Sequence, residues 1–312
     1  MKAKIIFILL VVVSNFAFSQ DKIIYLDSLY REVSESNYQI KRVIKDFEKE
    51  LNEHKFFEYN KDNKLLSEGT CAEKNIFKKI GTYTSYYLNG NKKQSTNYSE
   101  FMPIGLHQEW YENGNKKLEG EYLNIISKFT GNYKINQFWD EYNVQKVIDG
   151  NGFFYEKNEN CVTEGVLKNG YKDGEWKENH TDSYQILEIY SEGKFISGVN
   201  TDSDGIVVNY TEMEQKPEPV DGITHFYKYI GSNFNYTKSA IKNNIKGRII
   251  IQFVVDKYGN ITDLKVMKGL GHGLDEEAIR VISSYKNWRP GMQRGRNVRC
   301  SYAIPINLSG FQ

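Results

Sequence analysis

Residues Lys246–Leu308 decide the fold of the last third of this 312-residue chain, and they begin KGRIIIQFVVDKYGNITDLKVMKG (246–269). Every second residue of 249–255 is apolar (Ile249, Ile251, Phe253, Val255), and these alternate with the polar residues Arg248, Gln252 and Asp256. This is the period of a half-buried strand, and 257–260 supply a turn before a second strand. LDEEAIRVISSYKNWRPG (274–291) has apolar residues at helical spacing with acids in its first turn. GRNVRCSYAIPINL (295–308) alternates again. The order strand, strand, helix, strand predicts a small α+β domain.

These motifs resemble the carboxy-terminal domain of the TonB family of energy transducers. The resemblance rests on GRIIIQFVVD (247–256), LDEEAIRV (274–281), WRPG (288–291) and the final alternating strand. It implies two helices on a three-stranded antiparallel sheet over 223–312, without a cofactor. Tyr236-Thr237 stands where the family usually has Tyr-Pro, and Thr237 can cap the helix that follows. In the family this domain binds an extended peptide of an outer-membrane receptor or transporter along a sheet edge.

The final strand, expected from Arg296 to Asn307, is the candidate for that edge. Pro305 lies within it, and proline inside a sheet is confined to edges or strand ends. A partner strand would complete the free hydrogen-bond ladder. Capping by another part of the chain, or by a second copy of the domain, is an equal alternative. The candidate binding residues are Arg296, Val298, Arg299, Ser301, Ala303, Pro305 and Asn307.

Four arginines gather near this strand, at Arg289, Arg294, Arg296 and Arg299. A bidentate side chain of this kind suits contact with acidic segments of a partner. The simpler interpretation, that they are ordinary solvent-facing residues of a turn and a strand, is slightly favoured.

The amino terminus predicts export. Lys2 and Lys4 precede an apolar run over 5–13, and small residues follow at Ala17 and Ser19. This pattern is typical of a secretory signal peptide, expected over 1–19, and the run is short for a membrane span. We therefore expect a periplasmic protein. An uncleaved segment would instead anchor the chain in the inner membrane, as a TonB-type energy transducer.

A repeat fills much of the region between these ends. GTYxxYYxNGNKK (81–93) recurs 24 residues later as GLHxxWYxNGNKK (105–117). Asn-Gly between aromatic runs predicts a hairpin with positive φ at both turn residues. The pattern resembles the MORN-like repeats of YwqK-type antitoxins, and it predicts an all-β antiparallel hairpin array over 20–211.

The repeat aromatics have two interpretations. An exposed aromatic surface would suit a glycan or a protein, as in an envelope structural or glycan-binding protein. Packing of one hairpin on the next is favoured about two to one, because such repeats cannot bury a core alone. The residues concerned are Tyr86, Tyr87, Trp110, Tyr111 and Trp176.

Residues 212–222 hold two of the five prolines among charges, which predicts a stiff, extended linker. A net charge of +1 gives no electrostatic case for nucleic acid. Cys71 and Cys161 can form a disulfide in an oxidising compartment, and Cys300 is expected to be a buried free thiol. No catalytic residue is assigned, because no catalytic motif is present. No metal site is assigned either, since cysteines and histidines lack ligand spacing; the latter are His54, His107, His180, His225 and His272.

Overall fold

The structure is a computed structural model that describes residues 20–72, 77–123, 133–182 and 184–309. The expected signal peptide, 1–19, lies outside the described residues. The chain divides into two compact units, the first reaching Gly152 and including Asn169–Tyr171, the second made of Phe153–Lys168 and Lys172–Gln312. The division falls within the strand array and not at residues 212–222.

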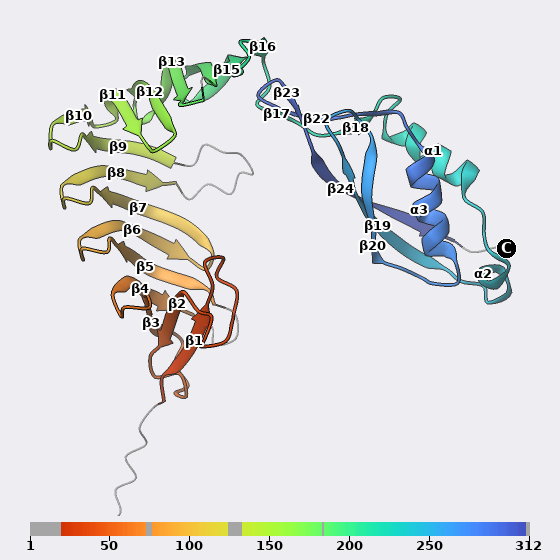
Figure 1. Ribbon diagram of the computed structural model, residues 1–312, viewed down its shortest axis with the longest axis horizontal. Helices are drawn as coiled ribbons and strands as arrows, with labels where there is room; N and C mark the ends of the chain where they lie inside the picture. The colour runs from red at the N-terminus through yellow and green to blue at the C-terminus, as the bar shows by residue number, and fades with distance from the viewer. Residues whose placement is uncertain (1–19, 73–76, 124–132, 183, 310–312) are drawn as a thin grey trace, which may run out of the picture. The chain divides into compact units, whose positions relative to one another are not determined.

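The first unit is built of antiparallel strands that follow one another in chain order, and each described strand pairs with its sequence neighbour (Figure 1). This confirms the expected all-β hairpin array. The strands are β1 (Lys22–Leu26), β2 (Ile40–Ile44), β3 (His54–Tyr59), β4 (Leu65–Cys71), β5 (Lys79–Tyr86), β6 (Lys92–Ser99), β7 (Met102–Trp110), β8 (Lys116–Tyr122), β9 (Tyr133–Trp139) and β10 (Gln145–Ile148).

The Asn-Gly turns differ from the expected type. Gly90 and Gly114 have φ of 90° and 89°, but φ is not positive at Asn89 or Asn113. The N–H of Gly90 donates to the carbonyl of Tyr87, and the strand register shifts just before the turn. One left-handed glycine beside a bulge, rather than a two-residue turn with positive φ at both positions, therefore closes each hairpin.

The second unit continues with antiparallel strands, each paired to its neighbour in the sequence. They are β11 (Asn151–Lys157, whose first two residues belong to the first unit), β12 (Cys161–Lys168), β13 (Tyr171–His180), β14 (Gln185–Ser191), β15 (Lys194–Thr201) and β16 (Val207–Tyr210). Trp176 packs over Gly165, where any Cβ would lie 2.4 Å from the indole ring. A glycine is therefore required opposite this tryptophan.

The carboxy-terminal part of this unit has the expected α+β fold. Its three-stranded sheet has the order β20 (Ile261–Lys268), β19 (Gly247–Val255), β24 (Cys300–Leu308). The two expected helices are α2 (Lys238–Lys242), which is short and which Thr237 caps as expected, and α3 (Leu274–Ser284). A further helix, α1 (Ile223–Asn233), was not predicted. Side chains of α1, α3 and the sheet share one core, in which Phe226, Phe253 and Ile282 are fully buried. The apolar residues that recur every second position in the strands and every 3.6 positions in the helices thus form one buried layer.

Residues 212–222 are not a free spacer. β17 (Glu214–Gln215) pairs with β22 (Gly291–Gln293), and β18 (Glu218–Pro219) pairs with β21 (Trp288–Arg289). The prolines keep the segment extended, as expected, but its backbone is hydrogen-bonded to the turn region after α3 instead of to water. The segment is part of the carboxy-terminal fold.

Two further expectations need correction. The strand expected from Arg296 to Asn307 is broken at Arg299 into β23 (Arg296–Val298), which pairs with β22, and β24. All three cysteines are free thiols, so the Cys71–Cys161 disulfide is not formed. These two residues belong to β4 and β12, which lie in different compact units.

Candidate peptide-binding edge and adjoining polar network

β24 is an edge strand in the part of the chain that the structure describes. It pairs with β19 along its whole length, from Gly247 opposite Leu308 to Val255 opposite Cys300, and β20 covers the other side of β19. The expected edge therefore exists over residues 300–308. Its sequence signal was Pro305, which lies opposite Ile250.

Pro305 also fixes which backbone groups face outward. It has no N–H to give, so it fits this pairing where its nitrogen faces away from β19. Backbone groups on a strand alternate in direction with each residue, so Ser301, Ala303 and Asn307 share the outward direction of Pro305. These three side chains are exposed, whereas Ile304 and Ile306 between them are buried. The outward backbone groups are then the N–H groups of Ser301, Ala303 and Asn307 and the carbonyls of these three residues and Pro305. They are available to pair with a further strand.

A shallow groove of about 340 Å³ lies where α1 meets the end of β24. We call it the α1 groove. It is lined by Tyr227, Ile230, Gly231, Phe234, Tyr236 and residues 305–309. Tyr227 is 39 % exposed and Gly231 has open space where a side chain would project. The groove was not predicted, because α1 and β24 are about seventy residues apart in the sequence.

The candidate residues Arg296 and Val298 do not lie on this edge. They belong to β23, and Arg296 reaches strands of the array instead: its guanidinium bonds Asp202 (2.7 Å), the carbonyl of Ile206 (2.6 Å) and the side chain of Asn200 (3.3 Å). Arg299, in the break, pairs with Asp263. Of the candidate set, only the residues from Ser301 onward form the edge.

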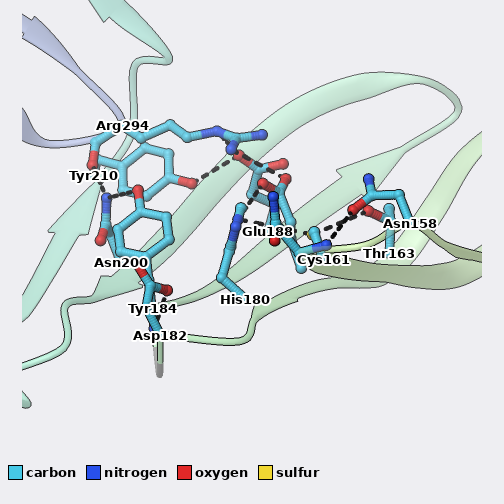
Figure 2. A network of polar contacts seen from close by, with 12 residues as sticks. Asn158, Cys161, Thr163, His180, Asp182, Tyr184, Glu188, Asn200, Tyr210 and Arg294 are labelled. Atoms are coloured by element: carbon cyan, nitrogen blue, oxygen red, sulfur yellow. Dashed lines mark hydrogen bonds and ion pairs between the residues drawn. The ribbon is translucent and has the colours of Figure 1, made fainter.

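Arg294, like Arg296, makes ion pairs within the chain. It sits in the β22–β23 turn with φ of 47°, and Figure 2 shows its guanidinium beside Glu188 (2.9 Å). Its guanidinium also lies 3.1 Å from the carboxylate of Glu178. Its carbonyl accepts from Asn200 Nδ2 (3.0 Å). The neighbouring Gly295 packs so closely on β16 that a Cβ would lie 2.8 Å from Val208. The four arginines are therefore paired with acids, Arg289 with Glu218 included, and are not a free basic patch.

Glu188 is the centre of this network. It is 2 % exposed and accepts hydrogen bonds from the hydroxyls of Tyr210 (2.7 Å) and Tyr190 (2.8 Å) in addition to the ion pair. Burial, together with these bonds to the carboxylate, raises the pKa of both tyrosines. The pKa of Glu178 is lowered, because hydrogen bonds from His180 and the charge of Arg294 outweigh its burial. The lowered pKa keeps the Glu178 carboxylate ionised at neutral pH.

The repeat tyrosines are used to join one hairpin to the next. The hydroxyl of Tyr87 donates to the carbonyl of Trp110 (2.9 Å), and that of Tyr111 donates to the carbonyl of Trp139 (2.9 Å). Asn89 and Asn113 likewise donate to Glu112 and Glu141 in the next turn. Trp176 is 4 % exposed, so it does not belong to a surface. These contacts favour the packing interpretation for Tyr87, Tyr111 and Trp176.

A hollow of about 600 Å³ in the first unit is consistent with an exposed binding surface for part of the repeat aromatics. It is lined by Lys64, Leu65 and residues 86–90, and so includes both Tyr86 and Tyr87. Burial and a hydrogen bond to Glu68 raise the pKa of Tyr86 to about 12. Its hydroxyl is therefore a neutral donor to a carboxylate already present.

Residues 232–308 match the family described as "Gram-negative bacterial TonB protein C-terminal". The match covers α2, α3 and the β20-β19-β24 sheet but not the strand array, whose MORN-like character remains a prediction. A search of curated proteins found no match to this chain. Among the described residues, no helix has the length and apolar character needed to cross a membrane. The carboxy-terminal part of this chain is therefore similar to the carboxy-terminal domain of TonB proteins.

Proposed function

We propose that this is a non-catalytic envelope protein whose carboxy-terminal domain binds an extended peptide segment of an outer-membrane transport protein. The peptide would add to β24 as a further strand, on the periplasmic side. The observation that carries the proposal is the free edge of β24 with Pro305 turned outward beside the α1 groove. TonB-family domains are interaction domains of the envelope, which supports the same class of partner.

The edge of β24 and the α1 groove would bind different parts of the peptide. Outward backbone groups of residues 301–307 supply the ladder, and alternate peptide side chains reach the α1 groove. Net contributions of about 0.5–1.5 kcal/mol per hydrogen bond, less the cost of ordering the peptide, give weak affinity, in the micromolar range. The groove adds apolar contact with Tyr227 and Phe234.

The test uses the full chain and synthetic peptides taken from periplasm-facing segments of outer-membrane transport proteins. Ala303→Pro removes one outward N–H, and Ala303→Val, which keeps it, is the matched control. We expect the proline variant to lose at least about five-fold in affinity, in line with the loss of about 1 kcal/mol per bond. Equal affinities in the two variants, with intact folds, would show that β24 is not the docking edge.

A second pair of variants tests the groove. Gly231 lies in α1 and an added Cβ meets nothing within 4 Å, so Gly231→Ala fits without a clash. The fold of Gly231→Phe is checked by circular dichroism before its binding is measured. The alanine is expected to stabilise the helix by about 0.5–1 kcal/mol and to leave binding unchanged. The phenylalanine fills the groove and should block binding. Undiminished binding by Gly231→Phe would remove the groove from the site.

The TonB-type energy transducer remains an alternative, and it depends on residues 1–19. Fractionation with mass determination of the amino terminus separates the two functions. A periplasmic chain starting at Gln20 or Asp21 supports the interaction protein, and a membrane-bound chain starting at Met1 supports the transducer.

Glycan binding by the array is favoured by one observation, the hollow beside Tyr86 and Tyr87. Cell-wall glycan fragments are the probe. Binding that is lost on replacing Leu88, which is exposed at the rim, by a charged residue would support it.

A further inference from the structure

Three potential metal ligands from two paired strands converge beside the network of Figure 2. Cys161 is the first residue of β12, and His180 is the last residue of β13. Glu178 lies two residues before His180 and therefore on the same face of β13. The N–H of Thr181 donates to the carbonyl of Asn160 (3.0 Å), which brings the two strand ends together. One ligand atom from each of the three side chains lies within 4.8 Å of the others.

The contacts fit a shared ion better than a catalytic relay. His180 Nε2 lies 3.7 Å from Cys161 Sγ and 2.8 Å from Glu178 Oε1. In a nucleophile–His–acid triad the acid orients the ring through the other nitrogen. Here the thiol and the carboxylate meet the same nitrogen. Three donors therefore point to one place instead of forming a chain.

The distances agree with tetrahedral zinc. Zn–S of about 2.3 Å and Zn–N of about 2.0–2.1 Å place the two ligand atoms about 3.6 Å apart, close to the Cys161–His180 separation. The carboxylate oxygen would need to move away from Nε2 by about half an ångström, to a separation near 3.4 Å. Cys161 is buried, and Glu178 and His180 are half-buried, so the ligands are shielded but reachable.

Arg294 prepares the carboxylate for this role. It holds Glu178 Oε2 at 3.1 Å and leaves Oε1 facing His180, which is how outer partners orient metal ligands. Its positive charge is balanced by Glu188 at 2.9 Å. A thiolate and one carboxylate then supply two negative charges for a divalent ion.

We propose that Cys161, Glu178 and His180 bind a zinc-class divalent metal ion, with the fourth position open. The thiolate and imidazole exclude the hard ions magnesium and calcium as preferred occupants. Spacing failed to reveal the site because no two ligands form a short cysteine or histidine motif. Only the hairpin brings residue 161 beside residues 178 and 180.

The first test is Co²⁺ titration of the metal-free full chain. We expect one equivalent to produce a thiolate-to-cobalt absorption band, which Zn²⁺ abolishes by competition. Cys161→Ser should lose the band, and His180→Gln should weaken affinity at least ten-fold. Cys300→Ser removes the half-buried thiol elsewhere and should keep the band. Absence of the band in the wild type, or its loss only in Cys300→Ser, would overturn the proposal.

A measurement on the wild type does not depend on whether the variants fold. X-ray absorption at the zinc edge of the zinc-loaded chain should show one sulfur neighbour at about 2.3 Å with nitrogen and oxygen neighbours. A shell without sulfur would mean that zinc binds elsewhere on the chain.

Discussion

Replacing Arg294 by methionine should detach the β22–β23 turn from the strand array of the second unit. Methionine retains most of the aliphatic volume but leaves Glu188, which is 2 % exposed, without its cationic partner. Breaking a buried ion pair by removing one partner costs about 3–5 kcal/mol. The hydroxyls of Tyr190 and Tyr210 still donate to Glu188, so we expect the lower end, about 3 kcal/mol.

Arg299→Met is the matched control. The substitution is the same, but Arg299 and its partner Asp263 have side chains 63 % and 61 % exposed. An exposed pair of this kind contributes about 0–1 kcal/mol, because water screens it. The difference in lost stability between the two variants therefore measures the effect of burying the ion pair.

Amide hydrogen exchange is the assay, because unfolding of a chain with two compact units is not a single equilibrium. In Arg294→Met the slow amides of 213–216 and 291–298 should exchange about 150-fold faster, the factor that corresponds to about 3 kcal/mol. In Arg299→Met the change should stay below about five-fold. Adding Glu188→Gln to Arg294→Met should recover part of the loss, since it removes the stranded charge.

The reasoning would be refuted by equal exchange rates in the two arginine variants. Faster exchange in Arg294→Met confined to the β14–β16 amides would also contradict it, because the turn would then be held by other contacts.

Three further predictions concern single contacts. A hydrogen bond from His107 lowers the pKa of Glu109 to about 2. The carboxylate thus stabilises the fold above about pH 4.5 by at most about 3 kcal/mol, which is lost as the pH falls toward 2. After correction for intrinsic exchange rates, the β7 and β8 amides of Glu109→Gln should exchange faster than those of the wild type at neutral pH, and the difference should shrink as the pH falls toward 2. Tyr111→Phe removes its bond to the next turn and should cost about 1 kcal/mol in the same assay, with Tyr142→Phe, whose ring is 79 % exposed, as control. Thr237→Ala removes the cap of α2, and the exchange rates of the α2 amides should report a loss of about 1 kcal/mol.

Local periodicity and turn chemistry were enough to predict most of the fold. Alternation over 249–255, helical spacing over 274–285 and Asn-Gly turns specify the strands, α3 and the hairpins through neighbours in the sequence. The hairpin of β9 and β10, whose turn follows Trp139, was not recognised as a repeat. Asn143 (φ of 63°) takes the place of the turn glycine there. Asn143 gives this turn the positive φ that glycine gives the others, but the sequence there lacks the Asn-Gly pair from which the other turns were predicted.

Long-range contacts were beyond sequence reasoning. Residues 214–215 contain nothing that predicts pairing with 292–293, so a proline-rich stretch reads as a free linker. Arg294 and Arg296 look like any exposed arginines until their acids, about 100 residues earlier, are brought beside them. The edge at Pro305 was predictable because proline limits its own environment, but the α1 groove was not.

The bonds between successive hairpins have a consequence for how this chain can change in length. Tyr87 and Asn89 donate to backbone carbonyls of the next hairpin, and Tyr111 and Asn113 donate to those of the hairpin after it. Each 24-residue segment therefore contacts its neighbours through the same kind of bond. Excising or duplicating one would change the width of the sheet by two strands, about 9–10 Å, and leave the remaining bonds in place. An array of this kind can be lengthened or shortened in steps by recombination, without the redesign that a single globular core would require.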